Sequence, residues 1–369
     1  MFSFFLFYVL PFLVSLILAF LLTALIRWWA IKRDIVDRPA PRKVHSKPIP
    51  LLGGLAVYLA FVLTLLIFWS RLLDGIIQPK YIVGIILGGL LLMIGGYLDD
   101  RYQLSPKKQI LFPIAACIVV IVSGVGIKFI TNPLGGYLHF DTWQILLFWW
   151  QGMPYYFTVW ADLFTLVWLV GMVYVTKLLD GLDGLATGIG VIGSFIIFGV
   201  SLFWDVAQSG TSVIALALAG ALFGFLIWNW HPAKIFLGEA GSTFIGFSLG
   251  VLALISGGKI ATALLIMGIP ILDVVWVIMR RTIMERKSMA QADRKHLHHR
   301  LLDIGFSHPR AVIFLYFVTG IFGLSSIFQG TQGKIKTLLF MIFFMLILAY
   351  YLVWKYKKST NERTNSEKL

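Results

Sequence analysis

The sequence predicts an all-α, polytopic integral membrane protein with about 10 to 11 transmembrane helices. Three observations predict this fold class. Hydrophobic residues make up 59 % of the 369 residues and charged residues only 13 %, and the mean hydropathy is +0.87. Apolar stretches recur at lengths near the ~20 residues that a helix needs to cross a bilayer. Charged residues gather between these stretches, which is not the pattern of a soluble globular protein.

Eleven apolar segments can be drawn along the chain. They are residues 2–26, 51–70, 81–98, 109–127, 159–177, 185–204, 212–230, 243–257, 260–279, 311–328 and 337–354. The first segment precedes the first basic residue, Arg27, so we expect a retained span rather than a cleaved signal peptide. We expect one membrane-embedded domain, residues 1–354, followed by a charged cytoplasmic tail, residues 355–369.

The loops differ in charge, and this difference predicts the orientation. Six of the 31 Lys and Arg residues follow even-numbered segments: Arg71, Lys80, Lys128, Lys259, Lys334 and Lys336. The other 25 follow odd-numbered segments or lie in the C-terminal tail. By the positive-inside rule, these basic loops are cytoplasmic and the N-terminus lies outside.

The net charge of +14 would also suit a nucleic-acid-binding protein. Here the basic residues cluster between spans, as orientation signals and sites for anionic ligands do, so we expect no nucleic-acid partner. The single cysteine, Cys117, lies in an apolar run. Intramolecular disulfides are therefore excluded, and a cysteine-based metal site is not expected.

The one sizeable external segment, residues 128–160, contains turn signals at Asn132-Pro133 and Gly135-Gly136. Residues 137–140 fit a short hairpin strand. The aromatic residues that follow are interpreted as an interfacial belt rather than a ligand cage. They are Trp149, Trp150, Tyr155, Tyr156 and Trp160.

Two aspartates, Asp180 and Asp183, lie between two apolar runs, and each is followed by a glycine. At a spacing of i, i+3 they share one face if the segment is helical. Ionised aspartate is costly inside a bilayer, so such residues are usually functional or lie at a watery edge. A polar loop between two spans is the alternative interpretation.

Two further clusters fall on the same face. Residues 42–54 combine cations with prolines and end in Gly53-Gly54, which favours an extended loop that holds a diphosphate; a simple orientation signal is the alternative. Asp99 and Asp100 end the third span. Adjacent carboxylates repel unless a cation or a proton lies between them, so a metal or general-base role competes with a solvated turn.

The last two clusters also lie on this face. Residues 236–242 place Glu239 in a Gly-rich turn before a span, where backbone N–H groups suit phosphate oxygens, although a helix cap is an alternative. Residues 292–300 combine three histidines with Arg and Lys, and no Cys completes a zinc site. Carboxylates for a hard cation, cations for phosphates and a surrounding bilayer predict an enzyme that joins a soluble phosphorylated substrate to a lipid, with Mg²⁺.

Together these motifs resemble those of the polyprenyl-phosphate N-acetylhexosamine-1-phosphate transferase superfamily, glycosyltransferase family 4, over roughly residues 30–310. The matching segments are Arg42-Lys43-x-His45-x-x-Pro48-x-Pro50-x-x-Gly53-Gly54, Gly96-Tyr97-Leu98-Asp99-Asp100, Asp180-Gly181-Leu182-Asp183-Gly184-Leu185, Phe236-Leu237-Gly238-Glu239-Ala240-Gly241-Ser242, Pro270-Ile271-Leu272-Asp273 and Asp293-x-x-His296-x-His298-His299. The last is similar to the form of the bacterial undecaprenyl-phosphate GlcNAc-1-phosphate transferase branch, which starts O-antigen, enterobacterial common antigen and teichoic acid chains.

This resemblance implies transfer of N-acetylglucosamine 1-phosphate, or a related amino-sugar phosphate, from the UDP-sugar to undecaprenyl phosphate, with release of UMP. It implies a multi-pass protein of the bacterial plasma membrane that contacts membrane lipid and has its active site on the cytoplasmic face. The cofactor it implies is Mg²⁺, with Mn²⁺ as an alternative. Homodimers occur in relatives, and the sequence leaves the oligomeric state open.

The resemblance also implies roles for individual residues. Asp99 or Asp100 activates or orients the lipid phosphate, and Asp180 and Asp183 shape the nucleotide side of the site. The metal ligands it implies are Glu239 and Asp100. The substrate-binding residues that we expect are His45, Lys47, Lys107, Lys177, His296, His298, His299 and Arg300.

The chain departs from the family pattern at two places. Members usually carry Asn-x-x-Asn just before the Asp-Gly signature, where this chain has Tyr174 and Lys177. The second of those Asn residues touches the metal region in relatives, so Lys177 either contacts the diphosphate or lowers the metal's coordination. Glu239 stands where the family has a metal-ligating Asp and is one methylene longer.

Two other classes of protein stay open. An ion-coupled transporter or lipid carrier would have charged residues near span centres, whereas only Asp273 lies deeper in a span here. An inactive lipid-binding scaffold is disfavoured because the carboxylate positions are retained, although Lys177 and Glu239 leave it open. Release of UMP would separate the transferase from both.

Overall fold

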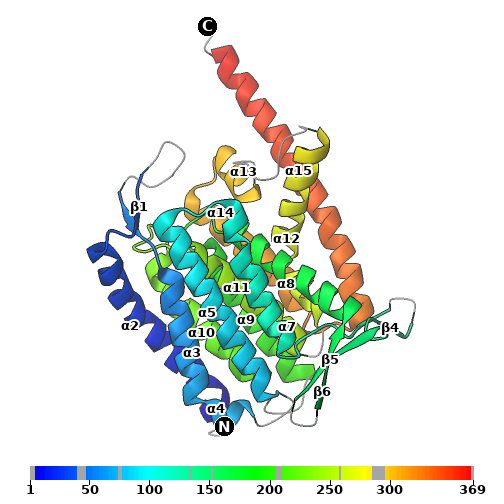
Figure 1. Ribbon diagram of the computed structural model, residues 1–369. Helices are drawn as coiled ribbons and strands as arrows, with labels where there is room; N and C mark the ends of the chain where they lie inside the picture. Colours follow the sequence, from blue (N-terminus) through cyan, green and yellow to red (C-terminus); the bar gives the residue numbers. More distant parts are fainter. Residues whose placement is uncertain are drawn as a thin grey trace.

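Helices make up most of the chain in the computed structural model, which describes residues 5–39, 47–73, 77–132, 135–150, 153–204, 209–256, 259–284 and 296–366. The long helices stand side by side as a bundle, and the N- and C-termini lie at its opposite ends (Figure 1). A chain with an odd number of predicted apolar segments is expected to end in this way.

Each of the eleven predicted apolar segments overlaps a long helix. In chain order these helices are α2 (Leu10–Lys32), α3 (Gly53–Ile67), α5 (Pro79–Tyr102), α7 (Leu111–Val122), α8 (Val159–Leu179), α9 (Leu185–Trp204), α10 (Gly210–Asn229), α11 (Gly238–Ile255), α12 (Ile260–Met279), α14 (His308–Ser325) and α15 (Thr331–Ser366). Within the described residues, nine are long and apolar enough to cross a membrane. With 15 and 12 residues, α3 and α7 are shorter than a full span. The prediction of an all-α polytopic membrane protein is confirmed.

Short elements join these helices. They are η1 (Phe5–Val9), β1 (Val36–Asp37), β2 (Ile49–Pro50), α4 (Trp69–Leu72), α6 (Pro106–Gln109), η2 (Arg280–Met284) and α13 (Leu297–Asp303). Strands β1 and β2 pair antiparallel and close the first loop after α2. Together with α13, this loop lies at the end of the bundle that the C-terminal helix reaches (Figure 1).

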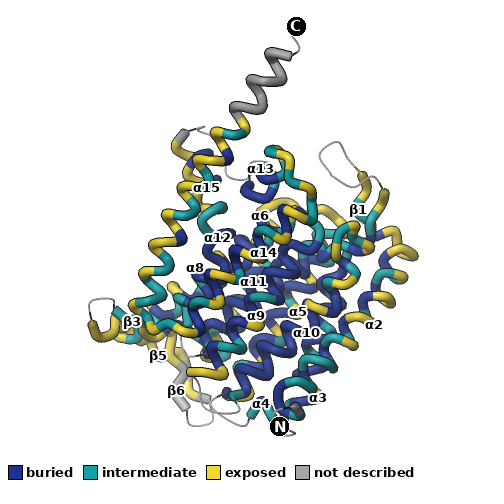
Figure 2. The backbone as a smooth tube through the Cα atoms, turned by 180° about the vertical axis from the view of Figure 1, so that it is seen from behind, coloured by how far each residue is buried: buried dark blue, intermediate teal, exposed yellow. Residues whose placement is uncertain are grey.

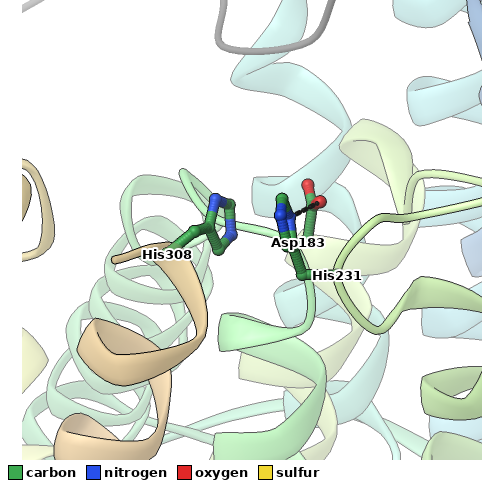
Figure 3. Close-up of side chains that lie close together, drawn as sticks. All are labelled: Asp183, His231 and His308. Carbon is green, nitrogen blue, oxygen red and sulfur yellow. Dashed lines mark hydrogen bonds and ion pairs between the residues drawn. The ribbon is translucent and has the colours of Figure 1, made fainter. Parts of the chain in front are cut away.

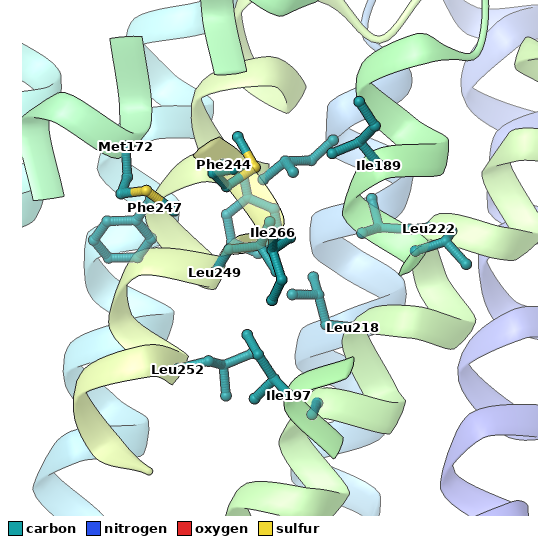
Figure 4. Close-up of a cluster of buried hydrophobic side chains, with 14 of the residues drawn as sticks. Met172, Ile189, Ile197, Leu218, Leu222, Phe244, Phe247, Leu249, Leu252 and Ile266 are labelled. Atoms are coloured by element: carbon teal, nitrogen blue, oxygen red, sulfur yellow. The ribbon is translucent and has the colours of Figure 1, made fainter. Parts of the chain in front are cut away.

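The hydrophobic core lies where α8, α9, α10, α11 and α12 pack together. Phe244 and Phe247 of α11 are fully buried there, next to Met172 of α8 and Ile266 of α12 (Figure 4). In the apolar stretches of α10 and α11, 83 % of the residues are buried, against 11 % in that of α15. Figure 2 shows the same gradient, with buried helices inside and exposed ones at the rim. The exposed apolar side chains of the rim suit a lipid environment.

Helices α2 and α10 approach each other unusually closely. A Cβ atom built on Gly220 would lie 2.3 Å from the carbonyl oxygen of Phe12, and one on Gly224 would lie 2.3 Å from that of Leu16. The Ser15 hydroxyl also donates to the Ala217 carbonyl at 2.6 Å. Small residues four apart let two membrane helices pack backbone to backbone, so this Gly-x-x-x-Gly pair fixes the first helix to the core.

The segment of residues 128–160 folds into two hairpins rather than one. Strand β3 (Phe129–Thr131) pairs with β4 (Tyr137–His139), where the sequence predicts a strand. Strand β5 (Gln144–Trp150) pairs with β6 (Met153–Thr158) in a hairpin that the sequence analysis did not predict. Its uncharged aromatic run suits both a strand and an interfacial belt. Trp149, Tyr156 and Trp160 are exposed, as belt residues are.

The last helix continues beyond the expected domain boundary. It runs without a break through residue 354 to Ser366 and projects from the bundle (Figure 1). The residues after the boundary are mostly polar and continue the preceding apolar helix.

Candidate active site

The carboxylates that the sequence analysis singled out come from three separate parts of the bundle. Asp99 and Asp100 lie in the last turn of α5, Asp180 and Asp183 lie in the turn between α8 and α9, and Glu239 lies in the first turn of α11. Asp100 interacts electrostatically with Asp99, Asp180 and Glu239. The structure therefore brings the predicted acidic residues into one cluster.

Glycines of the motifs allow this convergence. A Cβ atom on Gly54 of α3 would lie 2.2 Å from the backbone nitrogen of Gly241, and one on Gly96 of α5 would lie 2.2 Å from that of Ala240. The start of α11 thus fits between α3 and α5 only because side chains are absent. Since Asp100 follows Gly96 by four residues, it lies on the same face of α5 and points to the start of α11.

The end of the first loop is tied to the same place by backbone hydrogen bonds. Gly53 and Gly54 donate to the carbonyls of Phe236 and Leu237 at 3.0 and 2.8 Å, and Phe236 donates to the Pro50 carbonyl at 2.8 Å. The motif around residues 48–54 and the motif around residues 236–242 therefore form one unit.

Asp100 is the carboxylate with an unsatisfied oxygen. Its Oδ1 accepts a hydrogen bond from the Glu239 backbone N–H at 3.2 Å, which is the favourable N-terminal end of α11. Its Oδ2 is buried without a hydrogen-bond partner among the described residues. A Cβ atom on Gly238, whose φ is +75°, would lie 2.5 Å from this oxygen, so the glycine keeps the space beside it open. A buried carboxylate oxygen of this kind calls for a cation or a proton.

Asp99, by contrast, is engaged in local hydrogen bonds. Its Oδ1 accepts from the Leu104 backbone at 2.8 Å and from Nε2 of Gln109 at 2.7 Å. These bonds stabilise the turn between α5 and α6. The two adjacent aspartates therefore have different surroundings, a distinction that their sequence motif does not make.

The two departures from the family pattern lie in contact. The Nζ atom of Lys177 lies 2.6 Å from Oε1 of Glu239, with the side chains 22 % and 18 % exposed. Lys177 also donates to Oε1 of Gln109 at 3.1 Å and lies 5.6 Å from the centre of the Tyr174 ring. A chain of contacts thus runs from Asp99 through Gln109 and Lys177 to Glu239. Sequence reasoning missed Gln109, which no motif marks.

A recess opens beside this chain of contacts, between α5, α7 and α11. It is lined by Leu92, Gly95, Asp99, Gln109, Phe112, Pro113, Glu239 and Thr243. Its polar groups come from Asp99, Gln109 and Glu239, and its apolar groups come from α5 and α7.

Asp180 follows the last residue of α8 and is only partly exposed. Burial, together with the negative charges of Glu239 and Asp183, raises the pKa of Asp180 to about 7. A nearby cation would favour the ionised form of this carboxyl.

Asp183 belongs to a second group of side chains at the edge of the acidic cluster (Figure 3). Its Oδ2 accepts hydrogen bonds from Nδ1 of His231 at 2.8 Å and from the Ala233 backbone at 3.1 Å. His308, at the start of α14, completes a group whose ligand atoms all lie within 4.8 Å and that could hold a metal ion. The sequence analysis missed both histidines, which lie outside its five clusters.

The two imidazoles of this group are stacked, with centroids 4.2 Å apart and an interplanar angle of 20°. A metal ion lies in the plane of each imidazole that binds it. Nearly parallel rings therefore direct their nitrogen lone pairs along separate planes, so one ring must rotate before both bind the same ion.

The predicted histidine segment is anchored to α12. Asp273 accepts hydrogen bonds from Nδ1 of His296 at 2.9 Å and from the Leu297 backbone at 2.9 Å. The His298 ring lies against the Asp-Gly signature, since a Cβ atom on Gly181 would lie 2.2 Å from its Nε2. Burial, together with the neighbouring histidines, lowers the pKa of His298 well below its usual value, so this ring is neutral at pH 7.

The remaining predicted residues are more peripheral or lie outside the described chain. His299 and Arg300 are partly exposed in the first turn of α13, next to His298. Lys107 is exposed on α6, and Lys47 is exposed where the described chain resumes after the first loop. His45 lies outside the described residues.

Comparison with known proteins finds relatives that match nearly the whole chain. A sequence model described as glycosyl transferase family 4 matches residues 82–257. The chain is 35 % identical over 349 residues to a Bacillus subtilis protein named probable undecaprenyl-phosphate N-acetylglucosaminyl 1-phosphate transferase, covering 92 % of this chain and 89 % of that protein. It is 34 % identical over 349 residues to the decaprenyl-phosphate N-acetylglucosaminephosphotransferase of Mycolicibacterium smegmatis (87 % and 82 % covered).

The undecaprenyl-phosphate alpha-N-acetylglucosaminyl 1-phosphate transferase of Escherichia coli K12 is 30 % identical over 356 residues (91 % and 89 % covered). Its match, like the first, extends over nearly the whole of both chains. Together with the nine apolar helices, these relatives make the chain a multi-pass protein of the bacterial inner membrane. The chain belongs to glycosyl transferase family 4.

Proposed function

We propose that this protein transfers N-acetylglucosamine 1-phosphate, or a related amino-sugar phosphate, from a UDP-sugar to undecaprenyl phosphate and releases UMP. The observation that carries this proposal is the convergence of Asp100, Asp180 and Glu239 from three separate elements at one end of the bundle. The names of the relatives, which describe transfer to undecaprenyl or decaprenyl phosphate, support the same reaction.

The reaction joins two anions. A phosphate oxygen of the lipid attacks the β-phosphorus of the UDP-sugar, and the bond from this phosphorus to the bridging oxygen breaks as UMP leaves with that oxygen. Such a transfer depends chiefly on alignment and on neutralisation of charge. A membrane-embedded recess with a polar end suits an acceptor whose phosphate must meet a soluble donor while its tail stays in lipid.

A divalent ion fits the donor set. Carboxylate oxygens are the ligands that Mg²⁺ prefers, together with substrate phosphate oxygens and water. The unpartnered Oδ2 of Asp100 and the carboxylate of Glu239 would hold Mg²⁺, with Mn²⁺ as an alternative. When bound, the ion would neutralise charge on the phosphates.

The protein's own groups take the other roles. Asp100 orients the lipid phosphate, and Asp99 positions the turn through Leu104 and Gln109. Asp180 and Asp183 shape the nucleotide side. The diphosphate and the sugar are held by His45, Lys47, Lys107, Lys177, His296, His298, His299 and Arg300.

The charge distribution also sets the topology that we propose. The basic loops and the active site face the cytoplasm and the N-terminus faces out. Residues 1–354 act as one membrane domain, and residues 355–369 form a cytoplasmic extension. A homodimer is an open question that light scattering in detergent would answer.

The transporter alternative has less support. Its buried charges would lie near span centres, whereas Asp273, the deeper aspartate, is paired with His296 next to the active-site end. An inactive scaffold would keep the fold but release no UMP.

The test is UMP release from purified, detergent-solubilised protein with undecaprenyl phosphate, Mg²⁺ and a panel of UDP-amino sugars. We expect release with at least one donor, abolished by EDTA and by Asp100→Asn. No release with any donor, from protein shown to be folded, would overturn the transferase proposal and favour the scaffold.

A further inference from the structure

The acidic cluster contains a cation of its own. Lys177 lies at the end of α8, and its Nζ contacts the Glu239 carboxylate at 2.6 Å and the Gln109 amide oxygen at 3.1 Å. Glu239 also interacts electrostatically with Asp99, and Asp180 with Glu239. The ammonium group is therefore paired with Glu239, the carboxylate that itself lies near Asp99 and Asp180.

The arrangement holds the ammonium group in place. Gln109 accepts from Lys177 through Oε1 while its Nε2 donates to Asp99, so the amide is oriented by opposite charges at its two ends. The Tyr174 ring lies 5.6 Å from Nζ, within the range of a cation–π contact. Both partners of the ion pair are largely buried, unlike the exposed pairs that contribute little. The lysine is thus a fixed part of the cluster.

We propose that Lys177 acts as a built-in counter-cation and competes with the divalent metal ion for Glu239. This inference rests on the proposed function for its metal ion. With Oε1 of Glu239 taken by the ammonium, a metal ion must either displace Lys177 or bind the remaining oxygens of a cluster whose negative charge is already reduced by one. Both routes weaken metal binding relative to the same site without the lysine.

The length of the Glu239 side chain contributes to this ion pair. Glutamate is one methylene longer than aspartate, and it extends from the first turn of α11 to a lysine on α8. The Glu239 backbone N–H, at the N-terminal end of α11, meanwhile donates a hydrogen bond to Asp100. Residue 239 therefore contributes its backbone to one carboxylate and its side chain to the lysine.

The test is metal binding by the full-length protein in detergent, without substrates, measured by the electron paramagnetic resonance signal of free Mn²⁺. We compare the wild type with Lys177→Met, which keeps length and removes charge, and with Lys80→Met at the opposite end of the bundle as the matched control. Lys177→Met is expected to bind Mn²⁺ at least about tenfold more tightly, because it removes a positive charge from the edge of the site. Lys80→Met is expected to bind as the wild type does.

A double variant tests the part played by Glu239. If the lysine competes for this carboxylate, Lys177→Met combined with Glu239→Gln loses the gain in affinity. Unchanged or weaker Mn²⁺ binding in Lys177→Met, or a gain that survives Glu239→Gln, would overturn the inference. Should Lys177→Met not fold, Lys177→Gln keeps a polar group toward Gln109 and makes the same comparison. Because Mn²⁺ binding needs no turnover, failure here is distinguishable from failure of the wild type to release UMP.

Discussion

Lys177 and Glu239, on helices α8 and α11, form an ion pair with 2.6 Å between Nζ and Oε1. Together with Tyr174, they are the positions at which the chain departs from the motif pattern of the family it resembles, which has Asn at position 177 and Asp at position 239. Where the family pattern has a neutral and an acidic residue, this chain therefore has a cation and a longer acid that contact each other.

This contact predicts that the two positions are coupled. Lys177→Asn alone leaves Glu239 without its cation, and Glu239→Asp alone leaves a lysine whose partner is too short, so each should lower turnover. The double variant restores the family pair and should be more active than the product of the two single effects, by about tenfold or more. Initial rates of UMP release over the four proteins measure the coupling, and strictly multiplicative effects would show that the residues act independently.

Asp100→Asn is expected to reduce turnover by about 10²-fold or more, because the lipid phosphate loses its orienting charge. Glu239→Gln should have a similar effect. The matched control is Asp141→Asn between β4 and β5, which should keep wild-type turnover. Near-normal UMP release in both Asp100→Asn and Glu239→Gln would refute the site assignment.

His231→Ala removes a hydrogen bond to the Asp183 carboxylate. Hydrogen bonds to charged groups contribute about 1.5–3 kcal/mol, so turnover should fall by about tenfold or more. His231→Asn, whose amide can replace the Nδ1 donor, should lose less. Turnover is measured by UMP release at saturating UDP-sugar. An equal loss of turnover in the two variants would show that the missing hydrogen bond does not cause the loss.

The pKa of Asp180 predicts a pH dependence of stability. Its pKa is about 7 in the folded protein and about 3.9 in an unfolded chain, so the folded state binds the proton more tightly. The stability from this group is therefore full below about pH 4 and is lost as the pH rises toward 7. Asp180→Asn should flatten this slope. Denaturation midpoints in detergent with EDTA, between about pH 4.5 and 8, test it, and an unchanged slope would contradict the prediction.

Gly224→Leu should destabilise the packing of α2 on α10. The new side chain would enter the space beside the Leu16 carbonyl, and overpacking costs about 1–3 kcal/mol or more. Gly171→Leu on α8 is the matched control, because a Cβ atom there meets nothing within 4 Å. Thermal unfolding in detergent should show a lower midpoint for Gly224→Leu and no loss for Gly171→Leu.

Much of this protein was predictable from its sequence. A helix that crosses a bilayer needs a long apolar segment, so the eleven apolar segments can be recognised in the sequence alone. The carboxylates stood out for a different reason. An ionised side chain beside an apolar run, such as Asp180 or Glu239, costs free energy in a membrane and is usually functional. The hairpin of β5 and β6 was missed because an aromatic run suits both a strand and an interfacial belt.

Only the tertiary structure decided which residues touch. Asp99 and Asp100 are neighbours in one motif, yet Asp99 is hydrogen-bonded within its turn. The Oδ2 atom of Asp100, by contrast, is buried with no hydrogen-bond partner in the part of the chain that the structure describes. Lys177 and Glu239 are separated by two intervening helices in the chain, and their pairing follows from how α8 packs on α11. Hydropathy and motif spacing report what each segment needs locally, whereas contacts between segments depend on helix rotation and close approach, which packing of the whole bundle determines.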